Sequence, residues 1–278
     1  MFPYVPLGLP RTSKDTLGPI LGDFISEPSF PLYSPPMTPE QKILQLFHRG
    51  CADYNLLEDG DRVLIALSGG KDSLELVRLL GRQQRILKPR INVAAAHVLM
   101  DNIPYDTDRS YLTRFCEDHG VPLTIIHTSF REENDVTPRP GRRLHHKPRC
   151  FLCSWARRKA LFEYARDNGY NKLALGHHQD DILITMLMNM TFEGTIQTMT
   201  PRLKMEHYPV TIIRPLCLVP EQLIKDEAAR LCFEHQKTPC PYEEVTNRQA
   251  MTGIFHQLEA LNPEARYSLW RALVLNTP

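Results

Sequence analysis

Residues 63–73 read Val63-Leu64-Ile65-Ala66-Leu67-Ser68-Gly69-Gly70-Lys71-Asp72-Ser73, a short apolar run that passes directly into a glycine turn. An apolar run of this length is typical of a strand that is buried on both faces of a parallel sheet. Behind the turn, leucine and valine recur at helical spacing from Leu74 to Leu80. The stretch therefore predicts a strand, a loop and a helix in immediate succession.

Alternating strands and helices are predicted through most of the chain. Further strands are expected at 91–98, 123–127, 172–175 and 211–216, and helices at about 106–119, 154–168, 179–190 and 220–235. Such alternation predicts an α/β fold, a doubly wound parallel sheet, here with C-terminal helices after it. Ligands of these sheets bind beyond the carboxyl ends of the strands. The loops after the first and fourth strands are therefore the expected places for a site.

Three regions are expected along the chain. Residues 1–39 contain nine of the 23 prolines, so 1–37 is predicted to be an extended or disordered leader. Thr38, with Pro39 and Gln41 behind it, matches the start of a helix, which leaves open whether Met37 is the native first residue. Residues 38–245 are expected to form the sheet-containing domain, and 246–278 a C-terminal helical extension.

The composition excludes several classes of protein. The 33 basic and 32 acidic side chains give a net charge of +1, so the overall charge is no argument for nucleic-acid binding. The apolar runs are much shorter than the roughly 18–20 residues of a membrane helix, and no membrane association is expected. Seven cysteines without a secretory signal predict a reducing, cytoplasmic location, with thiols or metal ligands before disulfides.

The turn at 68–73 is predicted to bind a phosphate. Backbone N–H groups and the positive end of a helix dipole converge where a buried strand passes into a helix. The glycines let the backbone approach closely, Lys71 and the two serines can donate, and Asp72 can hold a magnesium ion or a hydroxyl group. The spacing differs from the Walker A form. A glycine turn that only joins strand to helix is the alternative.

Cys150 and Cys153 form a Cys-x-x-Cys pair at the start of a predicted cation-rich helix, where a thiolate is favoured. Three interpretations compete: a redox pair, half of a zinc site, or part of an iron–sulfur cluster. Cys240 and the adjacent His145 and His146 are candidates for further ligands. Arg157, one helical turn beyond Cys153, is either a ligand for phosphate or developing negative charge, or a solvated helix residue.

The remaining four cysteines are Cys51, Cys116, Cys217 and Cys232. Zinc ligation by these scattered residues is not excluded. They lie in apolar or helical contexts, however, and are expected to be thiols of the core.

A turn rich in histidine and aspartate, Gly176-His177-His178-Gln179-Asp180-Asp181, follows the fourth predicted strand. Asp180 and Asp181 are expected to act in catalysis or hold a metal, since paired carboxylates beside a triphosphate can bind magnesium. Capping of the next helix is the alternative for at least one of them.

A basic segment at 139–149 precedes the cysteine pair and contains no acid. Its permanent cations are Arg139, Arg142, Arg143, Lys147 and Arg149. Prolines and a glycine favour a loop, and such a loop suits contact with RNA phosphates without reading bases. A solvated charged surface is the alternative.

The string 68–73 resembles the PP-loop of the ATP pyrophosphatase family, whose members cleave ATP between its α and β phosphates and adenylate a carbonyl or amide oxygen. Within that family, the tRNA 2-thiocytidine synthetases show the same order of motifs. The matching motifs are Cys150-x-x-Cys153, Arg157-Arg158, Ala174 to Leu183, Ile213-Arg214-Pro215-Leu216 and Pro239-Cys240. The resemblance covers about residues 44–245.

The resemblance implies a site that uses ATP, Mg²⁺ and a 4Fe-4S cluster. Its ligands would be Cys150, Cys153 and Cys240, which leave one iron open for a sulfur atom. Relatives commonly have a second cysteine three positions after Cys240, where this chain has Glu243. If that cysteine relays sulfur, this protein does without it.

The resemblance also implies thiolation at C2 of an anticodon-loop cytidine, position 32, with tRNA and a cysteine desulfurase as partners. A homodimer stays open. Two other functions remain open from the residues: a PP-loop enzyme acting on another base or a small molecule, and a nucleotide-binding RNA module stabilised by zinc at the three cysteines.

Overall fold

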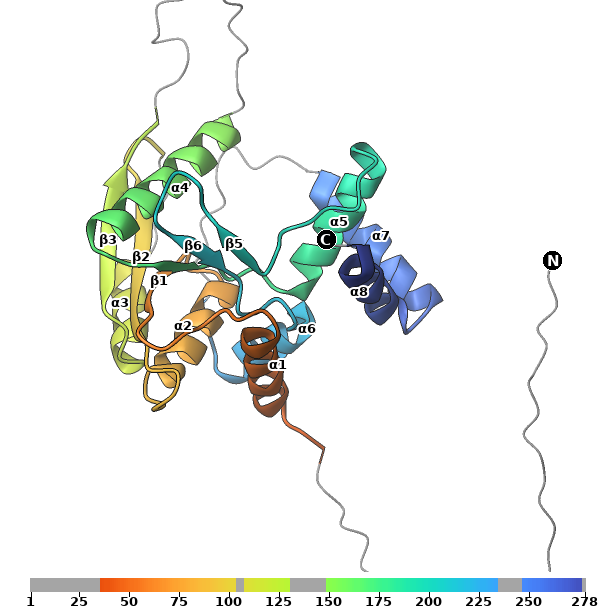
Figure 1. The fold of residues 1–278 in the computed structure, drawn as a ribbon, viewed down its shortest axis with the longest axis horizontal. Helices are drawn as coiled ribbons and strands as arrows, with labels where there is room; N and C mark the ends of the chain where they lie inside the picture. The colour runs from red at the N-terminus through yellow and green to blue at the C-terminus, as the bar shows by residue number, and fades with distance from the viewer. Residues whose placement is uncertain (1–35, 104–107, 131–148, 235–246, 277–278) are drawn as a thin grey trace, which may run out of the picture. The chain divides into compact units, whose positions relative to one another are not determined.

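The computed structural model describes residues 36–103, 108–130, 149–234 and 247–276. The elements, in order, are α1 Pro39–Asp53, β1 Arg62–Ala66, α2 Lys71–Gln83, β2 Asn92–Met100, α3 Arg109–Asp118, β3 Leu123–Thr128, α4 Arg149–Asp167, β4 Lys172–Ala174, α5 Gln179–Phe192, β5 Arg202–Lys204, β6 Thr211–Ile213, α6 Glu221–Arg230, α7 Asn247–Leu261 and α8 Ala265–Asn276. Along these residues, strands and helices alternate from α1 to β5, and three helices follow β6 (Figure 1).

The strands form one sheet in the order β3-β2-β1-β4-β6-β5. All neighbouring pairs are parallel except β5 and β6. The chain order reverses between β1 and β4, which pair directly, so the loops that follow these two strands open beside each other at the carboxyl edge. The predicted doubly wound parallel sheet is therefore confirmed, and the predicted search places are neighbours in space.

Strand β5 was not expected from the sequence. It is a three-residue edge strand with every residue exposed, and an edge strand with charged ends carries no run of buried apolar residues. Its hydrogen bonds come from pairing with β6.

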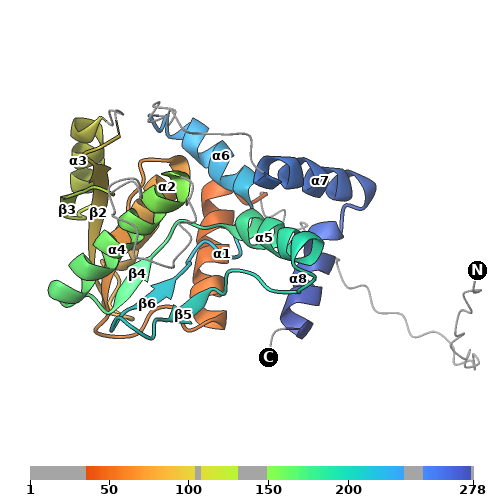
Figure 2. The same cartoon turned by 90° about the horizontal axis from the view of Figure 1, so that it is seen from above.

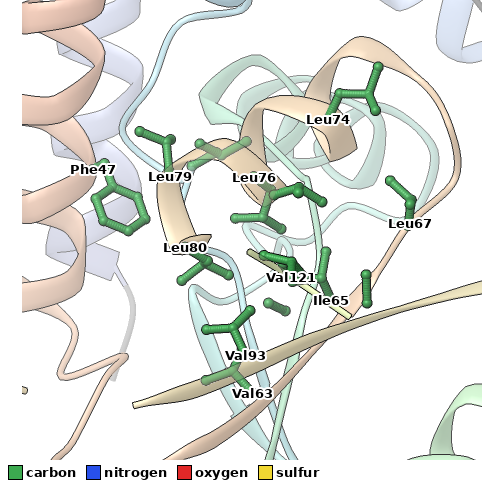
Figure 3. Close-up of a cluster of buried hydrophobic side chains, with 14 of the residues drawn as sticks. Phe47, Val63, Ile65, Leu67, Leu74, Leu76, Leu79, Leu80, Val93 and Val121 are labelled. Atoms are coloured by element: carbon green, nitrogen blue, oxygen red, sulfur yellow. The ribbon is translucent and has the colours of Figure 1, made fainter. Parts of the chain in front are cut away.

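Alternate residues of β1 point to opposite faces of the sheet. Val63 and Ile65 belong to a core shared with α1, α2, α3 and α6, whereas Leu64 belongs to a second core beneath α4. Figure 3 shows the first of these cores, where Phe47 of α1 and the leucines of α2 face β1 and β2. Burial on both faces explains why β1 is apolar without interruption.

Helix α1 starts at the cap that the sequence predicts. The Thr38 side chain accepts a hydrogen bond from the Gln41 N–H at 3.2 Å, and the Gln41 side chain accepts one from the Thr38 N–H at 2.9 Å. Pro39 occupies the first helical turn, where no partner for its nitrogen is needed.

The C-terminal helices α7 and α8 pack with α5 around a third apolar core. Figures 1 and 2 both show these three helices on the side of the sheet away from β3. The expected boundary at 245 and 246 lies outside the described residues, as does the leader except for Pro36 and Met37. Among the described helices, none is both long and apolar enough to cross a membrane.

Candidate active site at the carboxyl edge of β1 and β4

The loop after β1 is held by its own serines. The Ser73 hydroxyl accepts from the Gly69 N–H at 3.2 Å and donates to the Gly70 carbonyl at 2.8 Å. The Ser68 hydroxyl donates to the Ser73 hydroxyl at 3.1 Å. Gly69 has a φ of 88°, which favours glycine strongly. The first turn of α2, with its exposed N–H dipoles, therefore follows a preformed loop.

Lys71 sits between two carboxylates. Its Nζ lies 2.9 Å from Glu221 and 3.1 Å from Asp72. Burial by itself would lower the pKa of Lys71, but Asp72 and Glu221 outweigh it and the pKa is raised. A cavity of about 590 Å³ opens here, with Lys71, Glu221 and Lys225 in its lining. A protonated Lys71 can exchange these carboxylates for phosphate oxygens.

The aspartate–histidine turn closes over the loop. His178 caps α5, since its Nδ1 accepts from the Asp181 N–H at 3.4 Å, while Asp181 accepts from the His178 N–H at 3.0 Å. Nε2 of the same ring lies 3.8 Å from Asp72 Oδ1 and 3.5 Å from Asp181 Oδ2. Asp72 and Asp181 thus approach one point from two loops.

Gly176 permits this closeness. A Cβ at this position would lie 3.1 Å from the Asp72 carbonyl carbon and 3.1 Å from the Ser73 nitrogen. Both neighbours are backbone atoms that cannot rotate away. A side chain at 176 would therefore separate the two loops.

The two predicted aspartates are held by the C-terminal helices. Arg266 of α8 donates to both oxygens of Asp180, at 2.8 and 2.7 Å, and the Glu221 N–H donates to the same carboxylate at 2.7 Å. Burial alone would raise the pKa of Asp180, but these donors outweigh it and lower the pKa. Arg248 of α7 hydrogen-bonds Asp181 and Thr185.

Sequence reasoning missed Arg248, Arg266 and Glu221. They lie far along the chain from the turn that they contact, and no motif marks them. One signal was present: two adjacent aspartates at a buried helix start need cationic partners, and arginines occur in the predicted C-terminal helices.

His177 contacts Arg214, just beyond β6. Its Nδ1 accepts from Arg214 Nε at 3.2 Å. Burial, chiefly, lowers the pKa of His177 to about 4, although nearby Asp181 acts in the opposite direction. The ring is therefore neutral near pH 7 and serves as an acceptor.

The cysteine pair lies in the first turns of α4, with Cys150 exposed and Cys153 half-buried. Arg157 is half-buried on the same helix, close enough to contribute to the lowered pKa of the buried His97, which burial mainly causes. Arg149 is exposed. Five of the predicted site residues lie outside the described residues: Cys240, Arg139, Arg142, Arg143 and Lys147. Their roles, like those of the other site residues, stay predictions.

The other cysteines divide into two kinds. Burial raises the pKa of Cys116 and of Cys217 to about 12 and also raises the pKa of Cys51, so these three are thiols of the core, as expected. The expectation was wrong for Cys232, which is exposed at a positive φ of 53°. It lies just beyond α6, where the helix has ended.

Residues 37–238 match the model of a family described as the PP-loop domain. The chain belongs to the PP-loop family. The resemblance seen in the sequence is thereby confirmed.

Curated relatives of this PP-loop protein carry the name tRNA-cytidine(32) 2-sulfurtransferase. The one from Bdellovibrio bacteriovorus is 37% identical over 231 residues, 82% of this chain and 85% of that protein. The one from Geobacter metallireducens is 33% identical over 242 residues, 84% of this chain and 89% of that protein.

A solved structure is similar as well. It is the U34-tRNA thiolase NcsA from Methanococcus maripaludis with its 4Fe-4S cluster. It matches with a TM-score of 0.65 and 26% identity, over 84% of this chain and 78% of that one.

Gly176→Ala is expected to lower the free energy of unfolding by about 1–3 kcal/mol, as overpacking does, and to weaken ATP binding because the two loops separate. Chemical denaturation and calorimetric titration measure the two effects. Gly253→Ala is the control, because a Cβ there meets no atom within 4 Å and alanine favours the helix. Equal ATP affinity in Gly176→Ala and the wild type would contradict the role of this contact.

Arg266→Ala is expected to destabilise the fold by about 3 kcal/mol, since it leaves the buried Asp180 carboxylate without its paired cation. Arg271→Ala, an exposed arginine of the same helix, should change the free energy of unfolding by less than about 0.5 kcal/mol. Urea titration compares both variants. A similar small effect in both would show that the pair contributes little.

The free energy of unfolding should fall as the pH falls from about 6.5 towards 4. His177 keeps a pKa of about 4 in the folded chain against an ordinary 6.5, so only the unfolded chain takes up its proton in this window. His177→Gln should flatten this part of the pH profile in urea titrations, whereas His207→Gln, at an exposed position, should not. Parallel profiles for His177→Gln and the wild type would refute the assignment.

Proposed function

We propose that this protein is an ATP-dependent tRNA sulfurtransferase that converts cytidine 32 of the anticodon loop to 2-thiocytidine. One observation carries the proposal: the PP-loop and the aspartate–histidine turn meet at one point in a chain 30–37% identical to relatives named for this reaction.

The reaction needs two substitutions. The C2 oxygen of the base attacks the α-phosphorus of ATP, and pyrophosphate leaves. A sulfur nucleophile then attacks C2, and AMP leaves with the former base oxygen. The loop N–H groups at the start of α2 and the Lys71 ammonium are suited to the negative charge on the phosphates. The Lys71 ammonium lies 2.9 Å from Glu221 and 3.1 Å from Asp72. These two carboxylates keep Lys71 protonated and hold its ammonium group beside the loop.

Asp72 fits a Mg²⁺ ligand. Its Oδ1 is buried and has no hydrogen-bond partner among the described residues, which is costly for a carboxylate oxygen unless a cation or donor completes it. Asp181 is the second ligand that we assign, because it faces the same His178 nitrogen. Both aspartates accept hydrogen bonds, but the Asp180 side chain is only 6% exposed against 20% for Asp181. Asp180 is therefore less accessible to a metal ion, and Arg266 engages both of its oxygens. When bound, Mg²⁺ would neutralise charge on the triphosphate.

Cys150, Cys153 and Cys240 are the ligands that we assign to a 4Fe-4S cluster. The exposed Cys150 and half-buried Cys153 at a helix N-terminus fit thiolate ligands, unlike the core thiols, whose pKa values are raised. A cluster with three protein thiolates supplies an iron at which sulfur can be held. Arg157 is assigned to the negative charge that develops beside it.

The remaining parts of the proposal concern partners and place. The permanent cations of the basic segment would contact tRNA phosphates; they are Arg139, Arg142, Arg143, Lys147 and Arg149. A cysteine desulfurase would provide the sulfur. The protein would act in the cytoplasm. We leave open whether it works as a homodimer.

Nucleoside mass spectrometry of tRNA from a deletion strain tests the function. We expect 2-thiocytidine to disappear and to return when the gene is restored. Unchanged 2-thiocytidine would overturn the proposal.

Cys150→Ser and Cys153→Ser should fail to restore 2-thiocytidine in the deletion strain and should lose iron after anaerobic purification, because each removes a thiolate ligand. Cys232→Ser, at an exposed cysteine outside the site, should restore it fully. Zinc without iron or labile sulfide in the wild type would favour the zinc-stabilised RNA module instead.

A further inference from the structure

The outward face of α4 carries aromatic side chains in water. Trp155 is 53% exposed and Phe151, one helical turn before it, is 45% exposed. Lys159, one turn beyond, places its Nζ 5.5 Å from the centre of the Trp155 ring. Residues at this spacing share one face of a helix. We call Phe151, Trp155 and Lys159 the α4 stripe.

At the start of α4 this face is separate from the core beneath the helix. Ala156, Leu161 and Ala165 are among the residues that pack beneath α4, while Ser154, Trp155, Arg158 and Lys159 are exposed. The stripe ends before Phe162, which is buried against Tyr208. Leaving half of an indole in water forgoes part of the free energy that its burial would give. An exposed tryptophan beside a site therefore suggests a ligand with an aromatic plane.

The charge around the stripe limits what that ligand can be. Residues 149–159 contain four cations and no acid. The Lys159 Nζ lies 3.6 Å from a Glu163 carboxylate oxygen, and such an exposed pair holds the lysine only weakly. These cations favour a polyanion as the ligand of the stripe. Duplex phosphates alone would need the cations but not the rings, whereas unpaired bases stack on aromatic side chains.

The stripe also lies close to the proposed chemistry. Trp155 is two residues after Cys153, about 3 Å along the helix axis at 1.5 Å per residue, and about 200° around it. The ring of Trp155 and the proposed ligand Cys153 therefore lie on opposite sides of the start of α4. A base on Trp155 would leave Cys153 uncovered.

We propose that the α4 stripe is a stacking platform for an unpaired nucleotide of the tRNA anticodon loop. The inference rests on the proposed function, since it takes tRNA as the substrate. Trp155 and Phe151 receive the base, and Lys159 contacts the adjoining phosphate.

Tryptophan fluorescence tests the platform, because the chain has two tryptophans. Trp270→Phe leaves Trp155 as the sole reporter, and Trp155→Phe leaves Trp270, which packs against the core of α5, α7 and α8. The full-length variants are titrated with an anticodon stem-loop RNA and with a blunt duplex of equal phosphate number. We expect the stem-loop to quench Trp155, and neither RNA to quench Trp270.

Binding measurements add a second readout. Trp155→Ala should weaken stem-loop binding about fivefold or more, the lower end for loss of one base stack, and should leave duplex binding nearly unchanged. Trp155→Phe should restore most of the affinity. Lys159→Gln should reduce the slope of log affinity against log salt by about 0.7, as for one phosphate contact with a single strand.

The outcomes separate this inference from the proposed function. No quenching of Trp155, or equal quenching by stem-loop and duplex, overturns the platform even if 2-thiocytidine is made. Quenching by the stem-loop alone supports the platform, even if nucleoside analysis finds no thiolation and the proposed function fails.

Discussion

The approach of two loops at Gly176 is the constraint on which the site depends. A Cβ there would lie 3.1 Å from backbone atoms of Asp72 and Ser73, so the absence of a side chain at 176 lets the loops after β1 and β4 pack this closely. The direct pairing of β1 with β4 places these loops beside each other. Backbone N–H groups at the start of α2 and carboxylates at the start of α5 can then face one ligand.

The C-terminal helices belong to this arrangement although they lie outside the 37–238 match to the family. Arg266 and Arg248 hold the two aspartates of the turn. The Glu221 N–H also donates to Asp180, and the Glu221 carboxylate holds Lys71. A continuous chain of polar contacts therefore runs from Arg266 of α8 to Lys71, directly after the loop that follows β1. Removing a member of such a network leaves a buried charge unpaired, so these helices stabilise the site as well as the third core.

Helix α4 serves the site through two different faces. One face packs Ala156, Leu161 and Ala165 on the sheet and so fixes the direction of the helix start, where the cysteine pair lies. The opposite face holds Trp155 and Lys159 in water. A rigid helix can in this way hold the proposed cluster ligands and the proposed RNA contact surface at a constant separation.

The sequence by itself determined the strand–loop–helix unit at 63–80, the alternation that makes a doubly wound sheet and the cap at Thr38. It also determined that Cys150 and Cys153 lie near the start of a helix. Each of these depends on neighbours within a few residues, where apolar period, glycine and capping chemistry act directly. Tertiary structure alone decided that, within the part of the chain that the structure describes, Asp72 keeps an oxygen without a donor while both oxygens of Asp180 are paired. It also decided the exposure of Cys232 and the pairing of β5. The pairing of Asp180 depends on Arg266 and Glu221, which are distant in sequence and meet the turn only after the helices have packed. The other two properties likewise depend on how elements pack and pair, which local pattern does not determine.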